Sequence, residues 1–436
     1  MKKGCLRVLV LVWLIATATV LAGCGNGSPS ANDYNGVPGV SGSAGEESGW
    51  NDMLVCSAGP PPGSTVTQQY GLVSAVFVEN SNGTDDGVLR LIASMAAHGY
   101  QFYRTEAIPW GMIGASDVVL LQINAQWAER GGTNTDLISS VISAVLAHPC
   151  GFEGEIIVAD NGQAQFGSDW QGGSLDWSHP NSACRTMSTL DVIMYYQAQG
   201  YRITGSLWDE FTRVRVEEFS EGDYRDGFVV EDYIRATGLE VSYPKFTTEF
   251  GTHVSFREGI WDSEAGQFDR GRLVIINMPV LKSHFLLQQT GAVKNSMGTT
   301  SDMLTQTRAH NSVVLGGMGT QMAYTRMPVL NIMDMIWVGP DRGPEVRYDR
   351  AVEVNMIAAS IDPVALDVWT TIHVLMPEAE RFPGGRAAPM DPHGTIPGTF
   401  GFWLRLSLAE MVEAGYGFTM YEEDMLVVDN SSANYY

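Results

Sequence analysis

Residues 117–124 have the sequence DVVLLQIN, and a second patterned segment follows at residues 134–147. The first run is apolar at four successive positions and polar at both ends, which is typical of a strand buried on both faces of a sheet. The second segment carries apolar residues at the spacing of one helix face: Leu137, Ile138, Val141, Ile142, Val145 and Leu146. A buried strand followed by such a helix predicts an α/β fold with a largely parallel sheet flanked by helices.

The same alternation continues along the chain. Further strands are predicted at residues 155–160, 272–277, 330–338 and 354–360. Helices are predicted from residue 362 to about 375 and at residues 402–414. Asp362 followed by Pro363 marks a helix start, because Asp is a favoured N-cap and Pro fits the first helical position.

The pattern weakens between residues 161 and 270. Tryptophans are scattered there among Gly, Ser and acids, and residues 217–232 are strongly acidic. We interpret this segment as an irregular inserted or peripheral subregion that serves as a lid. The alternative is an irregular surface with a solvated run of charge.

Polar residues follow the ends of several predicted strands. In open α/β sheets, ligands bind beyond the carboxyl ends of the strands. We therefore expect one site formed by Asn124, Asp160, Asn277, Lys282, His284, Asp362 and Asp367.

Two neighbouring segments, NMPVLKSH at residues 277–284 and TGAVKNSMG at residues 290–298, carry unusual residues for this chain. The sequence has five lysines, and two of them, Lys282 and Lys294, fall here. Lysine is a compact, strongly hydrated charge whose pKa changes on burial, so arginine does not simply replace it. The segments predict a site for an anion, with backbone N–H groups of the Gly291 loop turned toward it. The alternative is that the glycines only permit turns and Lys294 pairs with a carboxylate.

Histidines and carboxylates extend the candidate chemistry. His284 and His310 are candidate acid–base groups or metal ligands. Asp160, Asp334, Asp362 and Asp367 are suited to a hard divalent cation, and His310 and Asp362 are the metal candidates. As alternatives, Asp362 serves only as an N-cap and Asp334 only binds backbone in a turn. No serine-hydrolase elbow, zincin motif or dinucleotide fingerprint occurs in the sequence.

The first residues resemble a bacterial lipoprotein signal. Positive residues precede a short apolar run, and LAGC at residues 21–24 matches a lipobox. We expect a signal peptide at residues 1–23, a lipidated Cys24 and a flexible linker to residue 63, followed by a body at residues 64–436. The protein would then be anchored to a bacterial membrane outside the cytoplasm, on the periplasmic face or the cell surface. A buried N-terminal helix is the alternative.

Charge and cysteine content exclude several classes. The formal net charge of −23 argues against a nucleic-acid partner, which requires a basic face. The cysteines after Cys24 are Cys56, Cys150 and Cys184, and export would place them where disulfides persist. Cys150–Cys184 is the favoured pair, because Cys56 lies in or near the linker. No Cys-x-x-Cys occurs, so no cysteine-ligated iron–sulfur cluster or structural zinc is expected.

The segments KSH at residues 282–284, TGAVKN at 290–295 and Gly298 resemble the signature of the domain-of-unknown-function family 362. Further resemblances follow in the expected order: LQIN at 121–124, VAD at 158–160, His310, residues 334–344 and ASIDPVALD at 359–367. The resemblance covers residues 117–375. Gln122 stands where the family has Lys, which removes one cation, and Ser283 stands in place of Thr. Many relatives carry iron–sulfur modules that this chain lacks, so their redox role is not carried over.

Together these features predict a lipid-anchored, extracytoplasmic enzyme that acts on a small anionic molecule. Lys282 and Lys294 would hold the anion, His284 would transfer a proton, and Asp362 or Asp367 would orient a cation or the lysines. Further ligand contacts are expected from Asn124, Asp160, Gly291, Asn295 and Asp334. The rival hypothesis is a non-catalytic lipoprotein that binds a small ligand or assists another envelope protein. A purely structural role would require these residues to be dispersed in the fold.

Overall fold

A computed structural model describes residues 74–127, 129–162, 179–305 and 308–432. The predicted signal peptide, Cys24 and the linker lie outside these residues. All the described residues belong to one structural unit.

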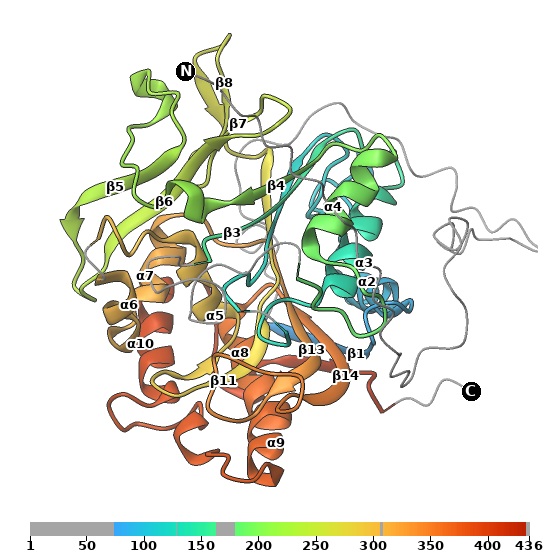
Figure 1. Ribbon diagram of the computed structural model, residues 1–436, viewed down its shortest axis with the longest axis vertical. Coiled ribbons are helices and arrows are strands. Elements are labelled where there is room, and N and C mark those ends of the chain that lie inside the picture. The colour runs from blue at the N-terminus through green and yellow to red at the C-terminus, as the bar shows by residue number, and fades with distance from the viewer. Residues whose placement is uncertain (1–73, 128, 163–178, 306–307, 433–436) are drawn as a thin grey trace, which may run out of the picture. The chain divides into compact units, whose positions relative to one another are not determined.

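The main sheet has ten strands within the described ranges (Figure 1). Eight of them lie side by side in the order β15 (Leu426–Asp429), β1 (Ala75–Asn80), β14 (Val352–Ser360), β13 (Leu330–Gly339), β10 (Leu273–Asn277), β2 (Val118–Gln122), β3 (Glu155–Asp160) and β4 (Ile203–Leu207). The short strand β11 (Val280–His284) pairs with β13 and with β12 (Gln288–Thr290).

Strand directions confirm the predicted fold class. The five strands β13, β10, β2, β3 and β4 are parallel to one another. Antiparallel pairing occurs around β14, which joins β13 to β1. The protein therefore has a mixed α/β fold whose main sheet is largely parallel.

Most predicted elements are present close to their predicted positions. Helix α3 (Thr135–Leu146) begins after Asn134, whose side chain accepts the N–H groups of Asp136 and Leu137. Helix α8 (Pro363–Thr370) begins after Asp362, as predicted, but it ends earlier. A wider helical turn (Thr371–Leu375) and α9 (Met376–Arg381) continue it. Helix α10 spans Phe400–Glu413. No helix in the described part of the chain is both long and apolar enough to cross a bilayer.

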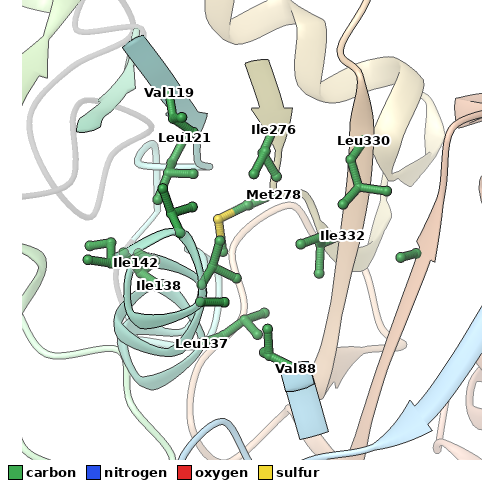
Figure 2. Packing of buried hydrophobic residues seen from close by; sticks show 14 of the residues in the cluster. Val88, Val119, Leu121, Leu137, Ile138, Ile142, Ile276, Met278, Leu330 and Ile332 are labelled. Atoms are coloured by element: carbon green, nitrogen blue, oxygen red, sulfur yellow. The ribbon is translucent and has the colours of Figure 1, made fainter. Parts of the chain in front are cut away.

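The central strands are buried on both faces, which is why most of their residues are apolar. Figure 2 shows Val119 and Leu121 of β2 turned toward α3, together with side chains of β10 and β13. Helix α2 (Gly87–Ala97) and helix α4 (Thr189–Ala198) cover the same face. Val118 and Leu120 point to the opposite face, where α7 (Gly317–Tyr324), α8 and α10 pack. Full burial of each such side chain contributes about 1.5–3 kcal/mol.

The described part of segment 161–270 was expected to be irregular, and that expectation is wrong: it forms strands, one α-helix and two short 3-10 helices. It supplies α4 and the edge strand β4 and then forms a second, antiparallel sheet. That sheet consists of β5 (Gly227–Ile234), β6 (Glu240–Thr247), β7 (His253–Ser255), β8 (Gly259–Asp262) and β9 (Gln267–Asp269) in sequential order. Phe228 and Phe246 pack with Trp208 in the core cluster that covers one face of the main sheet. The acidic run is partly paired, because Glu231 binds Arg235 at 2.7 Å and Arg257 at 2.8 Å.

The cysteine pairing differs from the favoured prediction. Cys150 is disulfide-bonded, but its partner is not Cys184. The Cys150–Cys184 pairing is therefore wrong. It was chosen because Cys56 lies in or near the linker, and sequence spacing alone does not fix a disulfide partner.

Candidate functional site

Four buried asparagines connect the carboxyl ends of β2 and β10 with the start of β13 and with the short helix α5 (Ala292–Asn295). Asn124 follows β2, Asn277 ends β10, Asn331 lies in β13, and Asn295 ends α5. The Nδ2 group of Asn295 donates to Oδ1 of Asn277 at 2.8 Å, and Nδ2 of Asn277 donates to Oδ1 of Asn331 at 2.9 Å. Nδ2 of Asn124 donates to Oδ1 of Asn295 at 3.2 Å. This chain of amides holds α5 against the strand ends.

Lys282 terminates the amide chain and is fully buried. Its Nζ donates to Oδ1 of Asn124 at 3.1 Å and to the carbonyl of Gly131. Burial, followed by the charge of Lys294, lowers the pKa of Lys282 well below its ordinary value. Lys282 therefore anchors the middle of β11, and it does not line the pocket described below.

Gln122 contributes to the same network at the position where the family resemblance expected Lys. Its Nε2 donates to the backbone carbonyl of Asn295 at 2.8 Å. A neutral amide thus satisfies the end of α5 next to the amide chain. The buried region that contains Lys282 therefore has a neutral side chain at this position.

Asp160 and Asp334 both accept backbone N–H groups. Oδ2 of Asp160, at the end of β3, accepts the N–H of Ala125 at 2.7 Å. Asp334 accepts the N–H groups of Asn134 at 2.8 Å and Ile336 at 3.0 Å. Burial raises the pKa of Asp160 well above its ordinary value and that of Asp334 to about 6. Asp334 therefore occupies the backbone-binding role that was the alternative for it.

Asp362 and Asp367 each accept backbone N–H groups in the first turn of a helix. Oδ1 of Asp362 accepts the N–H groups of Val364 and Ala365, and its Oδ2 accepts the hydroxyl of Ser74 at 2.5 Å. Asp367 accepts two N–H groups in the first turn of α5. Burial raises the pKa of Asp362 to about 6 and that of Asp367 to about 7.

The start of α5 is the loop that the sequence analysis expected to face an anion. The N–H of Ala292 lies 2.6 Å from Oδ1 of Asp367, and that of Val293 lies 3.0 Å from Oδ2. These two donors are thus bound by an internal carboxylate. The group of this segment that lines a pocket, and so is available to a ligand, is the side chain of Lys294.

A pocket of about 550 Å³ opens beside Lys294. Its walls come from the segment after β2, the β11–β12 turn, α5, α6 (Arg308–Ser312) and the loop after β13. The lining residues are Gln126, Trp127, His284, Phe285, Leu286, Lys294, His310, Arg342, Gly343, Pro344, Glu345, Arg347 and Arg350. Of the residues predicted for the site, the pocket brings together His284, Lys294 and His310.

Lys294 is the buried cation of this pocket. Its side chain belongs to a residue only 6% exposed, and its amine makes no hydrogen bond or ion pair with any described residue. Burial lowers the pKa of Lys294 to about 8, and the charge of Asp302 opposes this shift from beyond hydrogen-bonding distance. The structure therefore does not show the carboxylate pairing that was the alternative for Lys294.

His284 is held in one tautomer. Its Nδ1 accepts the backbone N–H groups of Leu286 at 3.2 Å and Leu287 at 3.1 Å. Because Nδ1 is the acceptor, the proton of the neutral ring resides on Nε2. Burial, followed by the charge of Lys294, lowers the pKa of His284 far below its ordinary value. His284 is therefore a neutral hydrogen-bond donor in the pocket wall.

Asp302 and His310 form a second pair beside Lys294. The backbone N–H of His310 donates to Oδ1 of Asp302 at 2.8 Å, and Nδ1 of His310 lies 3.9 Å from Oδ2. Burial lowers the pKa of His310 to about 4 and raises that of Asp302 to about 6. His310 is therefore neutral at pH 7. Sequence reasoning missed Asp302, although it lies only four residues beyond Gly298.

Three arginines from one loop contribute to the pocket. Arg350 pairs with Asp341, and Arg347 lies 3.4 Å from Glu345. Arg342 is exposed and makes no ion pair with a described residue. The family resemblance included residues 334–344, but sequence analysis assigned none of these arginines to the site; the available signal was three arginines within ten residues of an acidic chain. The pocket is thus a cationic region in a protein of net charge −23.

The two predicted metal candidates have different surroundings. His310 lines the pocket, whereas Asp362 caps α8 and binds Ser74. Among the described residues, no group of three or more His, Cys, Asp or Glu side chains is arranged to hold a metal ion.

Comparison with known proteins finds a family model over a segment that contains most of the pocket wall. A family model described as Domain of unknown function (DUF362) matches residues 272–371. This range contains β10, β11, α5, α6, β13 and α8, and hence most of the pocket wall. Residues 117–271, which the motif resemblance also included, lie outside the match.

A relative of known name is the thylakoid-associated protein sll1697 of Synechocystis sp.. It is 32% identical to this chain over 130 residues, which are 27% of this chain and 40% of the relative. The match thus spans less than half of the relative's length. No solved structure matches this chain.

Proposed function

We propose that the pocket beside Lys294 binds a small anionic molecule and that the protein is an enzyme acting on it. The observation that carries the proposal is a lysine amine, 6% exposed, that lines a pocket of about 550 Å³ and has no partner among the described residues. A buried ammonium without a partner is costly, and an anionic ligand would supply the missing partner. The volume lies within the range of about 300–1,000 Å³ that is usual for small-molecule sites.

The roles follow from the geometry of each side chain. Lys294 would contact the anion directly, and the Nε2–H of His284 would donate a hydrogen bond to it. Arg342 would hold an anionic group at the mouth, because a guanidinium suits carboxylate and phosphate groups. Lys282 and Asp367 are positioning residues, since they hold β11 and α5 through protein groups only.

The rival function is capture of a small ligand without turnover, or assistance to another envelope protein. A permanently charged arginine would be sufficient for capture. Lys294 instead has a pKa lowered to about 8, so its charged and neutral forms coexist near neutral pH. Such a shift at a pocket favours catalysis, because proton transfer and nucleophilic attack require the neutral amine.

We further propose that the protein is anchored outside the cytoplasm through a lipidated Cys24. The support is the lipobox-like sequence at residues 21–24, together with the disulfide at Cys150, since disulfides persist mainly in oxidising compartments. Metabolic labelling with palmitate, followed by membrane fractionation, tests the anchor. Label on the native chain but not on the Cys24→Ala variant supports it, whereas an unlabelled native chain contradicts it.

Isothermal titration calorimetry of the purified full chain tests anion binding. The probes are phosphate, oxalate, succinate, pyruvate and 2-oxoglutarate, each titrated into native protein, Lys294→Met and Arg342→Ala. Arg213→Ala is the matched control, because Arg213 is exposed and does not line the pocket.

At least one probe should bind the native chain, and the Lys294→Met variant should lose about tenfold or more in affinity. The Arg213→Ala control should bind like the native chain. Failure of every probe, or equal affinity in the native and Lys294→Met proteins, would contradict the proposal.

A further inference from the structure

The pocket presents two cationic groups of different character. The Lys294 amine belongs to a buried residue, whereas the Arg342 guanidinium belongs to an exposed one. Neither makes an ion pair with a described residue. Arginine binds carboxylates through a rigid pair of donors, and a neutral lysine amine is also a nucleophile. The arrangement therefore suits a molecule with a carboxylate at one end and an electrophilic carbon at the other.

We propose that the pocket takes a small carboxylic acid with a ketone or aldehyde group, and that Nζ of Lys294 forms an imine with its carbonyl carbon. This inference rests on the proposed function, because it names the class of anion and the bond formed with it. The reaction needs no oxidant or reductant. One amine and one carbonyl give one imine and one water.

The step balances as follows. The neutral amine attacks the carbonyl carbon and forms a C–N bond, and the carbonyl oxygen takes the proton that the nitrogen loses. The resulting carbinolamine then loses its hydroxyl group as water when the C–O bond breaks and the nitrogen gives up its second proton. The product is the C=N bond of the imine.

Lys294 is the suitable lysine among the three that the structure describes. Nζ of Lys282 donates to Asn124 and to Gly131, and Nζ of Lys245 donates to the carbonyl of Asp223. Neither lines the pocket. Lys294 lines it with a free amine, and burial lowers its pKa to about 8, which leaves a neutral fraction available for attack.

His284 supports the same chemistry from the pocket wall. Its Nδ1 is occupied by the N–H groups of Leu286 and Leu287, so Nε2 carries the proton. A neutral imidazole N–H that donates to the carbonyl oxygen makes the carbonyl carbon more electrophilic. His284 thus serves as a hydrogen-bond donor in this step and keeps its own proton.

Reductive trapping tests the imine. The full chain is incubated with pyruvate or 2-oxoglutarate in the presence of cyanoborohydride, which reduces an imine to a stable secondary amine. Peptide mapping by mass spectrometry then locates the adduct. The map is simple, because Lys245, Lys282 and Lys294 are the lysines beyond the predicted signal.

The expected result is a single adduct on Lys294 of the native chain. It should be lost in Lys294→Arg and retained in Lys245→Arg, where the changed lysine lies outside the pocket. Arg342→Ala should lower the adduct yield with pyruvate but not with acetone, which has the carbonyl group without the carboxylate. Because the adduct is located on the native chain, the test does not depend on the folding of a variant.

Two outcomes separate this inference from the proposed function. If oxalate binds in a Lys294-dependent manner but neither oxo acid gives an adduct on Lys294, the imine is refuted and anion binding stands. If oxalate fails to bind and no adduct forms, both are contradicted. Adducts spread equally over the three lysines would also overturn the imine.

Discussion

The carboxylate of Asp367 in α8 accepts the backbone N–H of Ala292 at 2.6 Å, in the first turn of α5. Its second oxygen accepts the N–H of Val293. A carboxylate at a helix N-terminus is favourable because the exposed N–H groups there carry partial positive charge. The loop that resembles an anion-binding site is therefore held by an internal anion. Its function is to fix α5, which carries Lys294 into the pocket.

Replacing Asp367 by Asn should destabilise the protein. An amide has one acceptor oxygen, so one of the two buried N–H groups of α5 would lose its partner, at a cost of about 1–3 kcal/mol. Urea unfolding followed by circular dichroism measures the change. Asp424→Asn is the control, since Asp424 is exposed and its side chain has no hydrogen bond within the described structure. Equal stability of Asp367→Asn and native protein would refute this role.

Replacing Gly291 by Ala should disturb both stability and anion binding. A Cβ atom at Gly291 would collide with Oδ1 of Asp367 and with the side chain of Gln289. The backbone there is extended, with φ −156°, so the expected loss of about 1–3 kcal/mol comes from the collision alone. Gly417→Ala is the matched control, because its Cβ would meet no atom within 4 Å. Unchanged unfolding and oxalate affinity in Gly291→Ala would show that α5 does not depend on this contact.

Oxalate affinity should fall as the pH rises through about 8, the pKa of Lys294 in the free pocket. The sign follows from linkage: an anion favours the ammonium form, so binding raises the pKa and takes up a proton above about pH 8. His284 and His310 stay neutral there, Lys282 has a strongly lowered pKa, and Asp302 titrates near pH 6.

Calorimetry in two buffers of different ionisation enthalpy measures this proton uptake. The observed binding enthalpy at pH 8.5 should change with the buffer in the native chain and not in Lys294→Arg. A pH-independent affinity between pH 7 and about 9 would contradict the assignment to Lys294.

Two substitutions should distinguish the structural role of His284 from its role in anion binding. His284→Asn keeps an acceptor near the position of Nδ1, so stability should stay near that of the native chain while anion affinity falls. His284→Ala leaves the N–H groups of Leu286 and Leu287 without an acceptor and should cost about 1–3 kcal/mol in addition. Unfolding and oxalate titration of both variants give the comparison. Equal affinity of His284→Asn and native protein would remove His284 from the anion site.

Much of the fold could be predicted because local pattern and burial agree there. Strand β2 is apolar at each central position because both faces are covered, and Asn134 and Asp362 mark helix starts by their side-chain oxygens. The antiparallel sheet was not predicted, since β7 and β9 have three residues each and β5 and β6 mix polar and aromatic residues. Pairing between distant segments stabilises such strands, and a local window does not contain that information.

The candidate site could be predicted only in part, because a sequence shows which residues are unusual but not which of them lie close together in the fold. The rarity of lysine pointed to Lys282 and Lys294, yet the sequence could not show that one is buried in an amide network and the other lines a pocket. The Arg342 loop and Asp302 were missed because their importance comes from tertiary proximity to Lys294. Asp367 was predicted as a ligand contact, and its bonds to α5 depend on the packing of α8 against α5.

The ionisation of Lys294 itself provides the most direct test of the account. Lysine labelled with ¹³C at Cε should give few NMR signals, because the sequence has only five lysines, and the Lys294→Arg variant assigns the relevant one. We predict that this signal titrates near pH 8 in the free protein and that its pKa rises when a binding anion such as oxalate is added. A Lys294 signal that titrates near 10.4, as in model peptides, and does not respond to any anion would contradict a buried, ligand-binding amine.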